Sequence, residues 1–134
     1  MREIYEVRAC QEGYAARLAC ERASDEQLAA IGAAREAVTQ PREPGERVSS
    51  NDSFHDLINV AAGNRRLRRL IEDSRLYHFN RRVAALYTAE EYAVSSRQHS
   101  EIIDALLVRD GDAAERLVRQ HVATALDVVL AKLY

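Results

Sequence analysis

Three histidines and one asparagine are the residues of this 134-residue chain whose types and spacing could do chemistry. Asn51 and His55 are four residues apart, a spacing that places two side chains on one face of a helix. His99 and His121 each lie at the margin of an apolar stripe later in the chain. These four side chains are therefore the first candidates for a shared site.

A shared metal ion would account for three histidines near the inward faces of three helices. A buried imidazole needs partners, because its ring presents a donor and an acceptor that water would otherwise satisfy. Imidazole nitrogens suit a divalent ion such as Zn²⁺ or Ni²⁺, and three of them with one amide oxygen leave room for an outside ligand. The alternative is that each histidine is a structural residue with hydrogen-bond partners of its own.

The elements that would position these residues are all helical. Ala, Leu and Val supply most apolar positions, and only two prolines and five glycines interrupt them, which favours long helices over strands. The periodicity predicts about six helices, over residues 4–22, 24–39, 49–63, 64–86, 88–110 and 112–133. Short connections then predict an all-α antiparallel bundle.

Local signals mark several ends of these helices. Gly63 fits the left-handed position that follows a helix, and Asn64 can cap the next helix. The segment QPREPGER at 40–47 contains both prolines and is predicted to be a linker between two helices. The spacing of a capping box occurs at Ser24 and Gln27, at Thr88 and Glu91, and at Asp112 and Glu115.

The buried face of the first helix is predicted from an apolar residue at every third or fourth position. That face would contain Ile4, Val7, Cys10, Tyr14 and Leu18. Cys20 lies on a different turn from Cys10, and no CxxC motif or further cysteine is available for a zinc knuckle. Both cysteines are therefore expected to be buried, reduced thiols.

Length and charge limit the class of protein. The chain is long enough for one domain, 1–134, with a single core. Its formal charge of -2 supplies no field that would draw it to nucleic acid or anionic lipid. No segment approaches the ~20 apolar residues of a membrane span, and the charged start MREIYEVRAC is unlike a signal peptide. A cytoplasmic protein without membrane contact is expected.

Four motifs resemble the FCD domain, the C-terminal effector domain of FadR-type regulators in the GntR superfamily. NDSFH at 51–55 followed by AAGN at 61–64 resembles the family's (D/N)xxFH…aaGN. RACQE at 8–12 is similar to its RxxxE, QHSEIIDAL at 98–106 to its EHxxIxxAL, and DGDAAERLVRQH at 110–121 to its gDxxxAxxxxxxH. The resemblance spans nearly the whole chain.

The resemblance implies that the bundle has a central cavity for a metal and an effector, with the metal held by Asn51, His55, His99 and His121. It also implies that Arg8 holds the carboxylate of an effector, a task for which a guanidinium is well suited. An intrahelical pair between Arg8 and Glu12 is the alternative for that arginine.

Two departures from the family pattern concern the metal. Many members have Asp at the position of Asn51 and Glu at that of Gln98, and a neutral amide ligand should lower metal affinity or change metal preference. Asp52 projects about 100° away around the helix and is only a minor alternative ligand. His78 matches no metal position and is not included in the metal site. It is expected either to line the cavity or to face solvent.

The function that the resemblance implies is non-enzymatic sensing of a small organic acid. The family's winged-helix DNA-binding domain is absent from this sequence, which is then either an excised piece or the product of a truncated gene, and DNA would be contacted only through that domain. A homodimer is expected because such regulators bind paired half-sites. A metal-dependent enzyme and a metal-free helical interaction module are the alternatives.

Overall fold

The fold was obtained as a computed structural model that describes residues 1–75 and 77–133, and the side chains of residues 76–80 are outside it. The expectation for the His78 side chain therefore lies outside the described residues. The described part contains eight helices and no strand. The helices are α1 (Arg2–Arg22), α2 (Asp25–Ala33), α3 (Arg35–Thr39), α4 (Pro44–Ala61), α5 (Arg65–Asp73), α6 (Tyr77–Ala84), α7 (Ala89–Leu107) and α8 (Gly111–Leu133).

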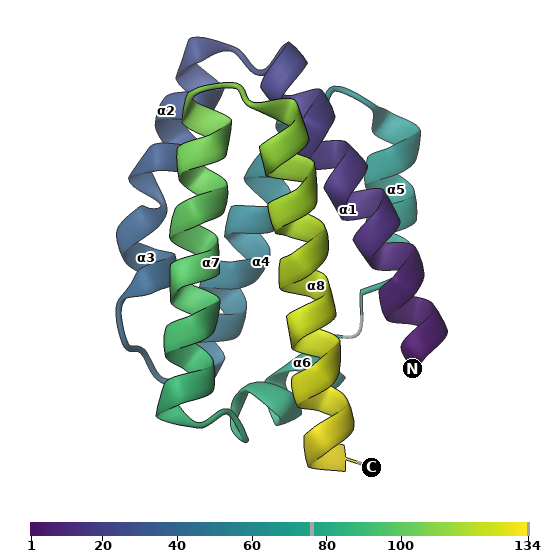
Figure 1. The fold of residues 1–134 in the computed structure, drawn as a ribbon, viewed down its shortest axis with the longest axis vertical. Coiled ribbons are helices and arrows are strands. Elements are labelled where there is room, and N and C mark those ends of the chain that lie inside the picture. Colours follow the sequence, from purple (N-terminus) through teal and green to yellow (C-terminus); the bar gives the residue numbers. More distant parts are fainter. Residues whose placement is uncertain (76, 134) are drawn as a thin grey trace.

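The predicted all-α bundle is confirmed, and its helices form a ring. Helix α1 packs on α8 and α4, α7 packs on α8 and α3, and α3 packs on α4, which closes the ring. The long helices run along the long axis of the molecule, and α6 lies across one end of the bundle, near the C-terminal half of α8 (Figure 1). This arrangement brings α1, α4, α7 and α8 around one interior space.

The main core contains residues from α1, α2, α3, α4, α7 and α8, and it lies toward the end of the bundle opposite α6. Phe54 and Ile58 from α4 are almost fully buried there, as are Ile102, Ile103 and Leu106 from α7. Burial of each such side chain contributes roughly 1.5–3 kcal/mol. These residues hold α4 and α7 at the level of His55 and His99, which are their sequence neighbours.

Helix α1 approaches α8 closely because its inner face is made of small residues. Ala15, Ala16 and Ala19 are fully buried, and a Cβ added at Gly13 would lie 2.6 Å from Cγ of Arg119. The apolar stripe predicted for this helix was wrong, since Ile4, Val7, Cys10 and Tyr14 are exposed and only Leu18 of that set is buried. The helix contacts neighbours on several sides, so small residues rather than large ones mark its buried face.

The two cysteines differ in environment. Cys20 is buried, as expected, and burial raises the pKa of its thiol. Cys10 is exposed, which contradicts the expectation, because it lies on the outward stripe of α1.

Two predicted helices are each broken into two, which raises the number from six to eight. The segment 24–39 divides at Ala34, whose N–H is shared between the carbonyl oxygens of Ala30 and Ile31 in a tightened final turn. The segment 64–86 divides after Asp73, where the Ser74 hydroxyl donates to the carbonyl oxygen of Leu70 at 2.8 Å. A hydroxyl that binds backbone carbonyls in this way competes with continuation of the helix.

The start of α4 also differs from the sequence prediction. The helix begins at Pro44, inside the segment expected to be a linker, and its first turn includes that proline. Proline suits the first helical position because its missing N–H would have no intrahelical partner there. The earlier start adds Arg47 to the face of α4 that carries Asn51 and His55, since the three residues are spaced by four.

Most of the predicted helix ends are confirmed. Ser24 and Thr88 both form complete capping boxes, Asn64 accepts a hydrogen bond from the Leu67 N–H, and Gly63 has a φ of 67°. The cap of α8 is an exception. Asp110, and not Asp112, accepts from a backbone N–H of the first turn, because α8 already begins at Gly111.

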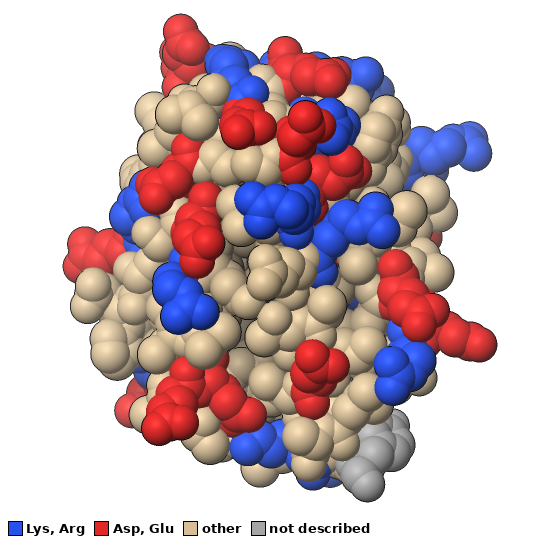
Figure 2. All heavy atoms as spheres, in the orientation of Figure 1, with Lys and Arg blue, Asp and Glu red and all other residues tan. Residues whose placement is uncertain are grey.

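The surface carries charges of both signs. On the face shown in Figure 2, acidic and basic side chains are interspersed with uncharged residues. None of the described helices is both long enough and apolar enough to cross a membrane.

Candidate metal and effector site

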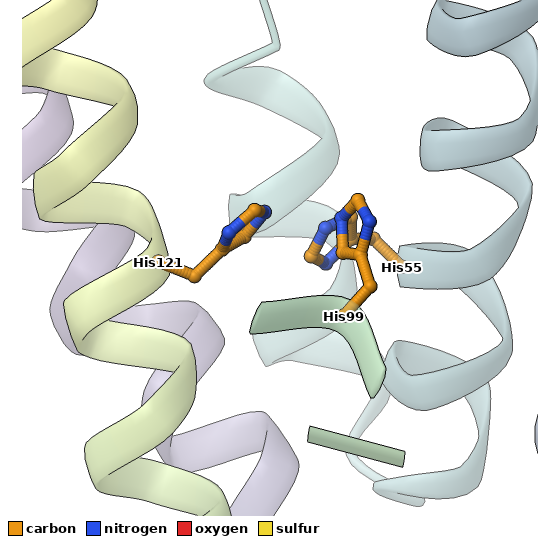
Figure 3. A group of neighbouring side chains, drawn as sticks. All are labelled: His55, His99 and His121. Atoms are coloured by element: carbon orange, nitrogen blue, oxygen red, sulfur yellow. The ribbon is translucent and has the colours of Figure 1, made fainter. Parts of the chain in front are cut away.

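Three histidines from three helices meet in the interior. His55 comes from α4, His99 from α7 and His121 from α8, and Figure 3 shows their rings turned toward one another. One nitrogen from each ring lies within 4.8 Å of a nitrogen of the other two. All three side chains are buried, so the cluster belongs to the interior of the fold and not to its surface.

Ring packing holds the cluster together. The centroids of His99 and His121 are 4.5 Å apart, and those of His55 and His121 are 5.7 Å apart in a stacked arrangement. Phe54 presents its edge or face to both His55 and His99, at centroid distances of 5.3 and 5.4 Å. Phe54 therefore limits how the rings of His55 and His99 can rotate.

Hydrogen bonds fix the orientation of His99. Its Nδ1 lies 3.0 Å from the carbonyl oxygen of Val38, which can only accept, so Nδ1 carries the proton. In the neutral ring Nε2 is then a lone-pair donor for a metal, and it faces Oδ1 of Asn51 at 2.9 Å. Two lone pairs that face each other repel, and a cation bound to both atoms removes that repulsion.

His121 is oriented by Gln98. Nε2 of Gln98 donates to the Thr124 hydroxyl oxygen at 3.0 Å, which leaves its Oε1 to accept from Nδ1 of His121 at 2.7 Å. The proton is thus held on Nδ1, and Nε2 of His121 is free to bind a metal. Outer partners of this kind usually fix the tautomer of metal-binding histidines.

A buried carboxylate, Glu12, lies behind His55. Its Oε1 is 3.9 Å from Nδ1 of His55, and its Oε2 accepts from Nε of Arg8 at 3.2 Å. Burial raises the pKa of Glu12, and the neighbouring Arg8 guanidinium opposes that shift. The intrahelical pair considered for Arg8 is therefore formed, and it places a carboxylate beside the histidine cluster.

The histidines are held in the neutral form that metal binding requires. Burial lowers the pKa of His99 to about 4, with the hydrogen bond to Val38 opposing the shift. Burial also lowers the pKa values of His55 and His121 well below the usual value, and the neighbouring His99 lowers both further. At neutral pH the cluster offers three unprotonated nitrogens, and with the Asn51 oxygen this donor set fits Zn²⁺ or Ni²⁺.

A cavity of about 130 Å³ opens beside the cluster. This volume is close to the ~150 Å³ of an engineered cavity that admits benzene, so a small organic molecule fits. Arg8 lines the cavity with its guanidinium carbon 5.0 Å from the centroid of the Tyr5 ring. The lining also includes Glu12, Val38, Arg47, Asn51, Asp52, His55, Tyr87, Tyr92, His99 and His121.

The structure brings together the residues named from the sequence. Asn51 contacts His99, the three histidines form one cluster, and Arg8 lines the same cavity. Asp52 also lines the cavity, but among the described residues the cluster of candidate ligand atoms contains no carboxylate.

The outer partners of the histidines were missed. The sequence gives a signal for two of them: Glu12 has the spacing of a partner for Arg8, and Gln98 is a departure from a family motif. The Val38 carbonyl had no signal, because a backbone oxygen carries no side-chain identity.

The fold and cluster together define a helical ligand-binding domain with a histidine-rich interior. Comparison with protein-family models matches residues 3–124 to the FCD domain, and the chain belongs to this family. FCD domains are regulatory, effector-binding domains of GntR-type transcription factors and are not enzymes. A search of curated proteins found no matching relative.

Proposed function

We propose that this domain senses a small organic acid at a divalent metal ion. Asn51, His55, His99 and His121 would hold the ion, which is Zn²⁺ or Ni²⁺, and Arg8 would bind a carboxylate of the effector. The observation that carries the proposal is the cluster of three buried, neutral imidazoles that opens onto a cavity lined by an arginine.

The residues of the site have separable roles in this proposal. Val38 and Gln98 keep the protons of His99 and His121 on the outer nitrogens, so that the inner nitrogens remain available. Glu12 holds Arg8 against the cavity wall while the remaining donors of the guanidinium can face an effector. The metal would supply a Lewis acid that binds an effector oxygen.

Effector binding would be coupled to the positions of the helices. The proposed ligands come from α4, α7 and α8, and Arg8 comes from α1, so one small molecule would contact elements that are far apart in the sequence. An effector that binds one arrangement of these helices better than another shifts the population toward it. In a complete regulator that shift would act on a winged-helix DNA-binding domain, and a homodimer would present two such domains.

Elemental analysis of the untagged, chelator-free protein tests the metal. About one Zn²⁺ or Ni²⁺ per chain is expected in the parent and none in a His55→Ala/His121→Ala variant. An Arg66→Gln variant, altered at an exposed side chain of α5, is the matched control and should retain the metal. Absence of metal from the parent, even after addition of either ion, would contradict the proposal.

Calorimetric titration with organic acids then tests the sensor function. A sensor binds its acid stoichiometrically and releases it unchanged, whereas a metal-dependent enzyme consumes it. Recovery of intact acid after prolonged incubation supports the sensor, and conversion of the acid by the metal-loaded protein would favour an enzyme.

A further inference from the structure

A second arginine, Arg47, lies in the wall of the cavity that Arg8 also lines. Its Nε donates to the carbonyl oxygen of Arg42 at 2.7 Å, and its guanidinium carbon lies 4.4 Å from the centroid of the Tyr92 ring. The Tyr92 hydroxyl in turn donates to the carbonyl oxygen of Gln40 at 2.8 Å. The Arg47 guanidinium is therefore held from two directions, by a hydrogen bond and by an aromatic ring.

Among the described residues, no carboxylate pairs with the charge of Arg47. In the described part of the chain Arg8 pairs with Glu12 and Arg75 pairs with Asp56, but no ion pair involves Arg47. Asp52 is the other acidic residue of the wall, and no ion pair between it and Arg47 occurs among the described residues. Nε of Arg47 makes its one hydrogen bond to a described residue, so its four remaining N–H donors are uncommitted.

The position of Arg47 on α4 relates it to the proposed metal ligands. Arg47, Asn51 and His55 follow one another at intervals of four residues, so they lie along one face of the helix. Each interval corresponds to a rise of about 6 Å. An arginine side chain at the first position can thus reach a group that extends a few atoms from the histidine cluster.

Resting on the function proposed above, we propose that Arg47 forms a second anion subsite and that the effector is a small dicarboxylic acid. One carboxylate binds at the metal and Arg8, and the second binds the guanidinium of Arg47. Four neutral ligands leave the full charge of a divalent ion in the cavity, and Arg47 adds one more positive charge. A dianion matches this charge better than a monoanion does, and two carboxylates on a short chain fit a cavity of about 130 Å³.

Matched pairs of acids test the subsite. Malate and 2-hydroxybutyrate differ only by a carboxylate in place of a methyl group, as do 2-hydroxyglutarate and 2-hydroxyvalerate. Each acid is titrated by calorimetry into the zinc-loaded chain at fixed ionic strength. At least one diacid is expected to bind about tenfold or more tightly than its monoacid partner, the effect of a charge-assisted hydrogen bond.

Substitution of Arg47 identifies the residue responsible. Arg47→Gln is expected to abolish the preference for the diacid and to change monoacid binding less than about twofold. Arg47→Lys keeps the charge without the planar fork and is expected to retain part of the preference, which also serves as the test if the glutamine variant does not fold. Arg66→Gln, which removes an exposed arginine outside the cavity, should leave the preference unchanged.

The outcomes separate this inference from the proposed function. Equal binding of both members of each pair by the parent, or an equal loss for both in Arg47→Gln, would overturn the subsite and leave acid sensing intact. The same loss of preference in Arg66→Gln would show a bulk charge effect and would also overturn it. Binding of none of the four acids would overturn the dicarboxylic effector and the subsite together.

Discussion

At the scale of single residues, the side-chain amide of Gln98 orients His121 although it carries no charge. It accepts from Nδ1 of His121 and donates to Thr124, so its orientation is set from both ends. A glutamate in its place would provide the same acceptor with a full charge. The family pattern at this position is thus satisfied in geometry, and the departure changes only the electronic effect on His121.

Removal of Gln98 should weaken metal binding without removing any proposed ligand. Gln98→Ala is expected to lower Zn²⁺ affinity about 10–100-fold, because His121 loses the partner that fixes its tautomer. Gln98→Glu keeps the acceptor and should bind Zn²⁺ at least as tightly as the parent. Competition with a chromophoric chelator measures both affinities, and an alanine variant with parental affinity would contradict the assigned role.

At the scale of helices, Gly63 lies in the short connection between the end of α4 and the start of α5. Its φ of 67° lies in the left-handed region, and Arg22 of α1 donates to the carbonyl oxygen of the preceding Ala62 at 3.2 Å. A Cβ at Gly63 would meet only Cδ of Arg22 at 3.5 Å, an ordinary contact. The cost of a side chain here is therefore one of backbone conformation.

Gly63→Ala is expected to lower the free energy of unfolding by about 1–2 kcal/mol. Gly45→Ala is the matched control, because Gly45 lies in the first turn of α4 with no atom near an added Cβ. That substitution should be neutral or raise stability by up to about 1 kcal/mol. Urea unfolding measures the two changes, and an equal effect of both would contradict the argument from φ.

The ends of the helices can be predicted from the sequence where they are set by residues close to them in the chain. The caps at Ser24, Asn64 and Thr88 depend on residues within one turn, and they could be found from the sequence. The exposed face of α1 could not be found from the sequence, because the burial of a helix depends on how many other helices surround it. The start of α4 was missed because Pro44 suits the first turn of a helix as well as it suits a linker.

The site was predictable in part for the same reason. The three histidines and Asn51 belong to motifs with helical spacing, so the sequence alone could nominate them. Their partners depend on tertiary packing: the Val38 carbonyl reaches His99 from α3, and Glu12 approaches His55 from α1. Arg47 could not be nominated once its segment was assigned to a linker.

At the scale of the whole molecule, a bound metal should stabilise the fold. Because the unfolded chain does not hold the cluster together, Zn²⁺ at 100 times its dissociation constant is expected to add about 2.7 kcal/mol. For a domain of this size that corresponds to a rise in melting temperature of roughly 10 °C. The His55→Ala/His121→Ala variant should show no such rise, and a rise of the same size in that variant would place the ion elsewhere.

The metal-free protein should lose stability as the pH falls. Its histidines have lowered pKa values, so below about pH 6.5 the unfolded chain binds protons that the folded chain does not. The free energy of unfolding then decreases by about 1.4 kcal/mol per pH unit for each such histidine, down to about pH 4 for His99. The raised pKa of Glu12 acts in the opposite sense, because the folded state then takes up that proton more readily.

Chemical unfolding between pH 4.5 and 7.5, with a chelator present, measures this dependence. His121→Gln removes one of the three groups and should show a shallower slope than the parent. Stability that is constant over the range in the parent would contradict the neutral state of the cluster.

The amide of Asn51 would allow the proposed metal site to persist without a bound ion. Turned by half a rotation, the side chain presents Nδ2–H in place of Oδ1, and it then donates to the same Nε2 of His99 that it would otherwise share with a cation. An aspartate would face that nitrogen with a further lone pair in either orientation. Occupancy of the proposed metal site would therefore follow the supply of metal around the protein, and the ion would act as a second signal beside the proposed acid.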